Sequence, residues 1–340
     1  SAGPHAAGKR LQVQLIRLKP DAAEAGFGRP ACMHDGITGQ LEHWEKALAN
    51  EFVFLIEQVI NGLLMGVYYL LIALGLSIIF SLGGVVNLAH GALFAIGAYM
   101  MVQITDIAGY GVAFIASPLI VAALGMLLER LFLRHFYKAD PVLSLLFTFG
   151  LAMIIEQALR MVFGASPLQF NVPNFARGQL MLGDFMYPYY RLAMLAVASV
   201  ALLLTWLLLN KTAFGKVVKA GVSDPDMVRA LGISLAPVLT GVCGIGIGLA
   251  GLAGVLLAPI SGVHPAMGQE IMTAAFVVVV IGGLGSFWGV VVAALLVGVI
   301  RGLTTYFYPP ASEASLYILM LAVLLLRPRG LMGERMDRLE

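Results

Sequence analysis

Charged side chains are scarce in this chain of 340 residues, because Asp, Glu, Lys and Arg make up only 12% of it. Hydrophobic residues make up 60%, and the mean hydropathy is +0.90, well above the values of water-soluble proteins. So little charge cannot cover the surface of a soluble globular fold. The composition therefore predicts an all-α protein, a polytopic transmembrane helical bundle.

Cysteine is rarer still, with only two residues in the sequence. Cys32 lies in a polar N-terminal stretch and Cys243 in an apolar run, so they indicate neither a disulfide framework nor a metal site. The net charge is only +2, and the basic residues are spread over short segments between apolar runs. We therefore expect no metal, no cofactor and no nucleic-acid partner.

Common catalytic motifs are also absent from the sequence. It contains no phosphate-binding loop of the form G-x-x-x-x-G-K-[ST], no H-E-x-x-H and no G-x-S-x-G. We therefore expect no catalytic residues and no enzyme activity. If the chain moves a solute uphill, the energy must come from another subunit or from an ion gradient.

Apolar runs of about 20 residues, the length that crosses a bilayer, predict eight or nine spans. They cover approximately residues 55–80, 90–105, 111–129, 142–163, 191–210, 235–257, 270–284, 287–304 and 314–327. The number stays open at the pair 270–284 and 287–304. There Gly282, Gly283 and Gly285 either separate two spans or interrupt one re-entrant unit.

The first 50 residues differ from the membrane domain that we expect at residues 52–334. They mix charged residues with Gly and Pro, and they lack the apolar core of a signal peptide. We expect residues 1–50 to be a poorly ordered extension, with Met33 as an alternative start that would make the extension non-native.

Basic residues indicate the orientation. They cluster in three segments between or after the spans: 130–138, 211–229 and 327–338. With nine spans all three segments fall on one side, which must be cytoplasmic because Lys and Arg are enriched there. The N-terminus is then outside and the C-terminus cytoplasmic.

Polar residues within or beside spans are costly and suggest function by default. They are Asn61, Asn87, His90, Glu129, Glu156, Gln157, Arg160, Glu270 and Arg301. Glu156 and Arg160 are four residues apart and can neutralise each other on one helix face. Asn87 is as well suited to capping a helix as to binding a ligand.

A polar segment, residues 213–234, interrupts the apolar sequence and is longer than a simple turn requires. Asp224 and Pro225 suit the start of a short helix, which we expect at 226–231, and Gly232 is a natural stop. This segment is either an ordinary connecting loop or a coupling helix that docks on a separate ATPase. Its docking residues would be Asp224, Pro225, Asp226, Met227, Val228, Arg229, Leu231 and Gly232.

Three stretches together resemble the Liv-type permease family of ATP-binding-cassette (ABC) importers for branched-chain amino acids. They are Asn61-Gly62 with GLSIIFSLGGVVNLAHGALFAIGAYM at 75–100, the polar segment 215–233, and VVVVIGGLGSFWGVVVAALLVG at 277–298 followed by RPRGLMG at 327–333. The polar segment is similar to the family pattern at Gly215, Ala220, Asp224, Gly232 and Ile233, whereas Val228 replaces the usual alanine. The resemblance covers about residues 52–334.

This resemblance implies an ABC importer permease fold in the bacterial inner membrane. The implied partners are a second related permease, two cytoplasmic ATPase subunits and a periplasmic substrate-binding protein. The implied cargo is a branched-chain or related small amino acid, or an amide. We expect its path to include Asn87, His90, Gly282, Gly283 and Gly285.

Two other functions remain open from the residues alone. An ion-coupled secondary transporter would use an intramembrane carboxylate such as Glu156 or Glu270, but it gives no reason for the polar segment. An intramembrane enzyme would use His90 or His264, but it has no matching nucleophile or metal ligands.

The absence of a phosphate-binding loop from the sequence leads to a prediction about ATP hydrolysis. The purified chain alone should not hydrolyse ATP, as measured by phosphate release in detergent. Hydrolysis by a demonstrably pure sample would contradict this prediction.

Overall fold

The computed structural model describes residues 31–137, 140–173, 176–182 and 185–333. Contacts within the chain separate residues 1–54 from a larger unit, residues 55–340. Helix α2 runs from Ala31 to Gly83, so residues 31–50, which we expected to be poorly ordered, are helical. The reason is local, because residues 41–49 (LEHWEKALA) are rich in good helix formers and contain no proline or glycine. Residues 1–30 lie outside the described part.

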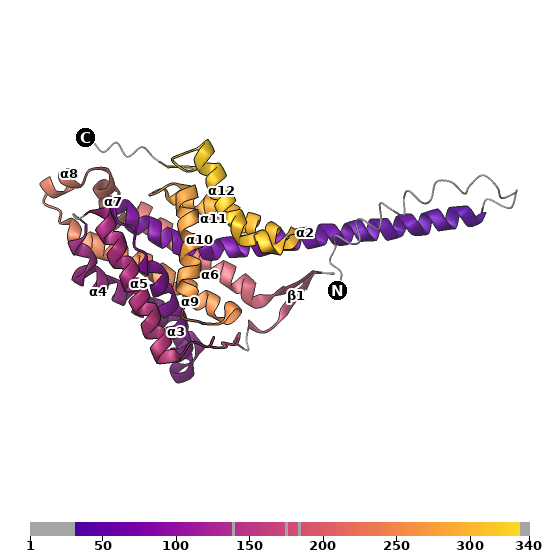
Figure 1. The fold of residues 1–340 in the computed structure, drawn as a ribbon, viewed down its shortest axis with the longest axis horizontal. Coiled ribbons are helices and arrows are strands. Elements are labelled where there is room, and N and C mark those ends of the chain that lie inside the picture. Colours follow the sequence, from indigo (N-terminus) through magenta and orange to yellow (C-terminus); the bar gives the residue numbers. More distant parts are fainter. Residues whose placement is uncertain (1–30, 138–139, 174–175, 183–184, 334–340) are drawn as a thin grey trace. The chain divides into compact units, whose positions relative to one another are not determined.

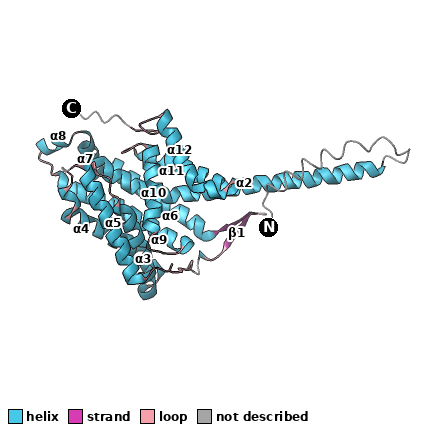
Figure 2. Cartoon of the chain, in the orientation of Figure 1, coloured by secondary structure: helices cyan, strands magenta, loops and turns pink. Residues whose placement is uncertain are grey.

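The larger unit is a bundle of helices, most of them joined by short turns, with a longer connection between Phe163 and Tyr189 (Figure 1). After α2 the helices are α3 (Ala89–Ala108), α4 (Tyr110–Leu131), η1 (Leu133–His135), α5 (Pro141–Phe163), α6 (Tyr189–Lys211), α7 (Ala213–Ser223), α8 (Pro225–Ala230), α9 (Leu235–Ser261), α10 (Met267–Gly282), α11 (Phe287–Phe307), η3 (Pro309–Ala311) and α12 (Ser312–Leu326). Strands β1 (Gln179–Leu182) and β2 (Phe185–Pro188) form an antiparallel hairpin before α6 (Figure 2).

Among the described residues, eight helices are long and apolar enough to cross a membrane. Helix α10 is also apolar but has only 16 residues. It is separate from α11, because Gly283 and Gly285 take positive φ values of 98° and 85° in the turn between them. The residues expected at 270–284 and 287–304 therefore form two helices separated by a glycine turn.

Helix α9 lies at the centre of the packing and contacts α3, α4, α6, α7 and α8. Its glycines and alanines leave little side-chain volume, so neighbouring backbones come close to it. Gly246 and Gly75 of α2 illustrate this, because a Cβ atom at Gly75 would lie 2.3 Å from the Gly246 carbonyl oxygen. Small residues permit such contacts between membrane helices, which have no hydrophobic driving force toward one another.

Helix α2 contacts α11 in the same way. A Cβ atom at Gly298 would lie 2.3 Å from the carbonyl oxygen of Gly62 and 2.4 Å from the nitrogen of Gly66. These are backbone atoms and cannot rotate aside as a side chain can. Close helix packing therefore accounts for these glycines.

Chain direction places two regions at opposite ends of the bundle. Helices α7 and α8 connect the end of α6 to the start of α9, and the hairpin β1–β2 precedes the start of α6 (Figure 1). The start of α6 and the end of α9 therefore lie together, at the end away from α7 and α8.

Replacing Gly298 tests this packing. We expect Gly298→Val to destabilise the folded chain by at least the roughly 1–3 kcal/mol typical of overpacking, because backbone atoms block the new side chain. The measurement is the apparent melting temperature of detergent-solubilised protein. Gly111→Val is the matched control, since a Cβ atom there meets no atom within 4 Å. Equal melting temperatures for the two variants would contradict the prediction.

Candidate functional site

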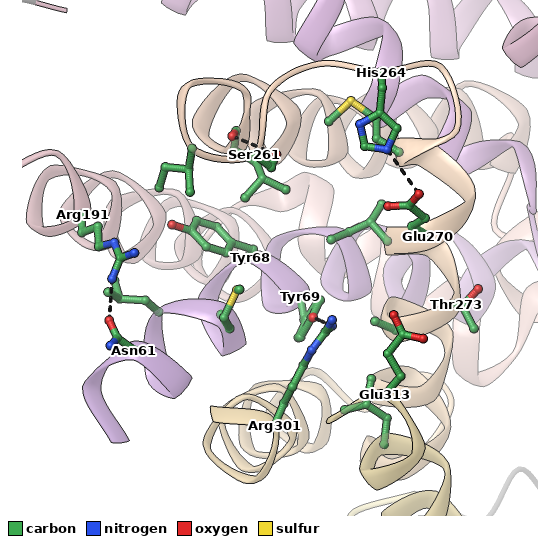
Figure 3. A pocket seen from close by; sticks show the side chains of 18 of the residues that line it. Asn61, Tyr68, Tyr69, Arg191, Ser261, His264, Glu270, Thr273, Arg301 and Glu313 are labelled. Carbon is green, nitrogen blue, oxygen red and sulfur yellow. Dashed lines mark hydrogen bonds and ion pairs between the residues drawn. The ribbon is translucent and has the colours of Figure 1, made fainter. Parts of the chain in front are cut away.

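A cavity of about 560 Å³ opens between α2, α6, α9, α10, α11 and α12. It lies at the end of the bundle away from α7 and α8, because Arg191 near the start of α6 and Ser261 at the end of α9 both line it. Its polar lining residues are Asn61, Tyr68, Tyr69, Arg191, Ser261, His264, Glu270, Thr273, Arg301 and Glu313 (Figure 3). A cavity of this size is typical of a small-molecule site.

Three of the charged residues already have partners. Arg191 Nη1 donates a hydrogen bond to Asn61 Oδ1 at 2.6 Å. His264 Nε2 lies 3.2 Å from Glu270 Oε1. Arg301 Nη1 donates to the hydroxyl oxygen of Tyr69, whose side chain is buried. These bonds orient the side chains toward the cavity.

The charges in the cavity are not neutralised by direct pairing. Within the described part of the chain, neither Arg191 nor Arg301 has a carboxylate oxygen within 4.0 Å. The Glu313 carboxylate likewise has no ion pair there. Positive and negative groups are therefore both available to a bound molecule.

The remaining lining is apolar except for Tyr317, which has a polar hydroxyl group. The apolar part comes from Leu64, Met65, Leu257, Ile260, Met267, Ile271, Ala274 and Leu316. An apolar wall with a few convergent charged groups suits a small molecule that has both charged and hydrocarbon parts.

Asn87 and His90, expected on a substrate path, do not line this cavity. Both are buried, and Asn87 Oδ1 accepts the backbone N–H of Ala89 at 3.0 Å, as a capping residue does. His90 Nε2 lies 3.2 Å from the carbonyl oxygen of Ile72 and so joins α3 to α2. Their place on a substrate path stays a prediction.

The glycine break after α10 lies away from the cavity as well. The backbone N–H of Leu331 donates to Ile281 and that of Met332 to Gly282, at 2.8 and 3.1 Å. A Cβ atom at Gly283 would lie 2.6 Å from the nitrogen of Gly333. The dense glycines therefore let the C-terminal segment 327–333 pack on the end of α10.

The sequence analysis recorded Asn61, Glu270 and Arg301 as polar residues near spans but did not group them. It missed Tyr69, Arg191 and Glu313 altogether. Arg301 carried the strongest signal, because it is the only charged residue in the apolar helix α11. The others come from four different helices, and only the fold brings them together.

The polar segment forms two helices at the other end of the bundle. Helix α7 was not expected; it begins after Thr212, whose Oγ1 accepts the Gly215 N–H at 3.1 Å. Helix α8 begins after Asp224, whose Oδ1 accepts the N–H groups of Asp226 and Met227 at 3.1 and 2.9 Å. Gly232 follows α8 with φ of +80°, a conformation that favours glycine.

Exposure divides the residues of α8 and its C-terminal turn. Met227 is 57% exposed and Leu231 71% exposed, whereas Val228 is only 4% exposed. Val228 therefore packs within its own chain and is not available to fill a pocket on another protein, contrary to our expectation. Asp226 and Arg229 are exposed and form an ion pair at 2.9 Å. We call the exposed side chains Val222, Met227, Leu231 and Ile233 the α8 surface.

A buried polar cluster lies next to this surface, between α4, η1 and α9. Glu129 is fully buried, accepts a hydrogen bond from Thr240 Oγ1 at 2.5 Å and pairs with Arg134 at 3.6 Å. Arg134 also donates to Thr240 Oγ1 at 3.1 Å. Tyr137 lies 3.7 Å from Cys243 Sγ, and burial raises the pKa of its hydroxyl. The cluster holds the connection after α4 against α9.

Comparisons with known proteins agree on one family. A family model described as "Branched-chain amino acid transport system / permease component" matches residues 58–326. The chain is 27% identical over 301 residues to the high-affinity branched-chain amino acid transport system permease protein BraD of Pseudomonas aeruginosa, covering 84% of this chain and 97% of that protein.

Two relatives come from one bacterium, Salmonella typhimurium. Both are named as high-affinity branched-chain amino acid transport system permease proteins. LivH is 26% identical over 304 residues, covering 84% of this chain and 98% of LivH. LivM is 26% identical over 296 residues, covering 79% of this chain and 68% of LivM.

The different burial of Val228 and Leu231 makes a prediction about stability. Val228→Asp should destabilise the chain itself by several kcal/mol, because it places a carboxylate in an apolar contact. Leu231→Asp should change stability little, because that side chain is exposed. The measurement is the melting temperature of each detergent-solubilised variant in the absence of any partner protein, and it should be lower for Val228→Asp. The prediction is wrong if Leu231→Asp is the less stable variant.

Proposed function

We propose a transport function for this chain, which belongs to the family of permease components of branched-chain amino acid transport systems. It is the membrane-spanning permease subunit of an ABC importer in the bacterial inner membrane. It carries branched-chain amino acids, or related small amino acids or amides, and partner ATPase subunits supply the energy.

The α8 surface is the observation that carries this proposal. Met227 of α8 and Leu231, which follows α8, expose large apolar side chains between two membrane spans. Exposed apolar groups with charges around them are typical of a protein contact. The segment 215–233 is similar to the docking-loop pattern of the Liv-type permeases at Gly215, Asp224 and Gly232, so an ATPase is the partner that we assign to this surface.

The subunit composition follows from the same proposal. Two ATPase subunits bind on the cytoplasmic side, a second related permease completes the membrane part, and a periplasmic protein delivers the substrate. The two permease relatives in Salmonella typhimurium support a second, related permease. Lys216, Lys219 and Arg229 support a cytoplasmic position for α7 and α8, with the N-terminus outside and the C-terminus inside.

Helix α9 connects the α8 surface to the cavity. It has 27 residues, about 40 Å of helix, and runs from the turn after α8 to the cavity. When ATP closes the ATPase dimer, α8 moves with it and α9 transmits the displacement to the cavity. The buried polar cluster of Glu129, Arg134 and Thr240, which we call the Glu129 cluster, links η1 to α9, so η1 moves together with α9. Alternating access then arises from rocking of packed helices.

An ion-coupled carrier fits these contacts less well. Glu156 is engaged by Arg160 at 3.0 Å, and Glu270 lies 3.2 Å from His264 with its side chain 68% exposed. Neither carboxylate is a buried, unpaired group able to bind a coupling ion. Such a carrier also needs no α8 surface.

Removing the apolar groups of the α8 surface tests the proposal. Met227→Asp with Leu231→Asp should abolish co-purification of the ATPase and uptake. Each replaced side chain contributes on the order of 1.5–3 kcal/mol when buried in a partner, and the new carboxylates add a desolvation cost. The permease itself should remain folded in the membrane, because both side chains are exposed.

The matched control is Ile107→Asp, which places a carboxylate at a residue that is 85% exposed, near the end of α3. It should leave ATPase binding intact. Arg229→Ala, which removes only an exposed ion pair, should have a small effect. Normal uptake and co-purification in the double variant would refute docking at α8.

A further inference from the structure

Arg301 and Glu313 present opposite charges to one cavity from neighbouring elements. Arg301 belongs to α11, and Glu313 to the first turn of α12, which follows after the short helix η3. Both side chains line the cavity and point into it in Figure 3. Their charged groups are not within the 4.0 Å that defines an ion pair. A bound molecule with charges of both signs therefore has an oppositely charged side chain for each of them in this cavity.

The guanidinium of Arg301 is oriented by Tyr69 and keeps further N–H donors for a bound molecule. It donates one hydrogen bond to the hydroxyl of Tyr69, and its Cζ atom lies 5.7 Å from the centre of the Tyr69 ring. Tyr69 is only 3% exposed, so its position is fixed by packing. A guanidinium has five N–H donors, and those that Tyr69 does not bind can hold a carboxylate in a bidentate manner.

Glu313 is the complementary group. The cavity has two carboxylates, and His264 engages the other one, Glu270. An ionised carboxylate only accepts hydrogen bonds, so the partner that suits Glu313 is a donor of positive charge such as an ammonium group. Leu64, Ile271 and Leu316 supply an apolar wall of the same cavity.

We propose that Arg301 binds the α-carboxylate and Glu313 the α-ammonium of a zwitterionic amino acid in this cavity, and that Tyr69 positions Arg301. This assignment rests on the proposed transport function. The ligand's side chain lies against the apolar wall. A molecule that lacks either charged group leaves one charge of the cavity without a partner, so the site selects zwitterions over amides and simple acids.

Binding to the purified full-length chain in lipid nanodiscs tests the assignment. The probes are L-leucine and L-alanine as zwitterions, L-leucinamide without a carboxylate, and 4-methylpentanoate without an ammonium group. Equilibrium dialysis measures each affinity. The unmodified chain should bind at least one zwitterion about 10- to 100-fold more tightly than either analogue, as expected for a charged hydrogen bond.

Each variant should lose one kind of discrimination. Arg301→Gln should weaken zwitterion binding about 10- to 100-fold and leave the affinity for L-leucinamide unchanged. Glu313→Gln should do the same to the zwitterion and leave 4-methylpentanoate unchanged. Tyr69→Phe should shift affinity in the direction of Arg301→Gln but less, and Arg301→Lys should restore part of the loss.

Arg130→Gln and Asp106→Asn are matched controls, since both residues are exposed and lie outside the cavity lining. They should bind all four probes as the unmodified chain does. An equal loss for every probe in Arg301→Gln would reveal a structural role and overturn the assignment, as would unchanged selectivity. So would failure of both zwitterions to bind the unmodified chain.

The outcome is separate from that of the transport proposal. Co-purification with the ATPase depends on Met227 and Leu231 and needs no bound amino acid. If the Met227 and Leu231 variants lose ATPase binding while the Arg301 and Glu313 variants show no change in selectivity, the importer assignment is supported and only the zwitterion site is refuted. If the selectivity holds while docking fails, the chain binds amino acids but is energised in another way.

Discussion

Helix α2 comes closest to α9 and α11 at its glycines, and these close contacts help to set the position of the cavity. Gly62 and Gly66 meet α11, and Gly75 meets α9, at distances that leave no room for a Cβ atom. Helices in lipid gain little from burying apolar surface, so close van der Waals contact must hold them. The same contacts place Tyr69 beside Arg301 and so set the charge pattern of the cavity.

Helix α9 joins the two regions to which we assign function. It begins after the α8 surface and ends at the cavity lining, and glycine contacts along its length press it against α2, α3 and α4. Val228 is buried at the start of this connection, while the Glu129 cluster ties η1 to α9 near Thr240. Alternating access in a permease driven from outside the membrane requires a rigid element that transmits movement. Helix α9 meets this requirement, because it contacts α8 at one end and lines the cavity at the other.

Several residues expected at functional sites also make structural contacts within the chain. Val228 of α8 and Leu231, which follows α8, are three residues apart, yet one is buried and the other exposed. Asp224 accepts the first N–H groups of α8, which explains its presence without any partner. Gly282 and Gly283 receive the C-terminal segment, and His90 joins α3 to α2. The contact of Asp224 is local, whereas those of Gly282, Gly283 and His90 join segments far apart in the chain.

Composition and local spacing were enough to predict an all-α membrane bundle, most of its spans and the start of α8, because these depend on hydropathy and on hydrogen bonds between near neighbours. The family resemblance also followed from contiguous motifs. The sequence analysis did not predict the helical course of residues 31–50 or of α7, because these helices depend on propensity and capping and not on a membrane-spanning apolar run. The cavity could not be predicted. Asn61, Arg191, Arg301 and Glu313 lie on four helices separated by up to 252 residues of chain, and only packing between those helices brings their charges into one space.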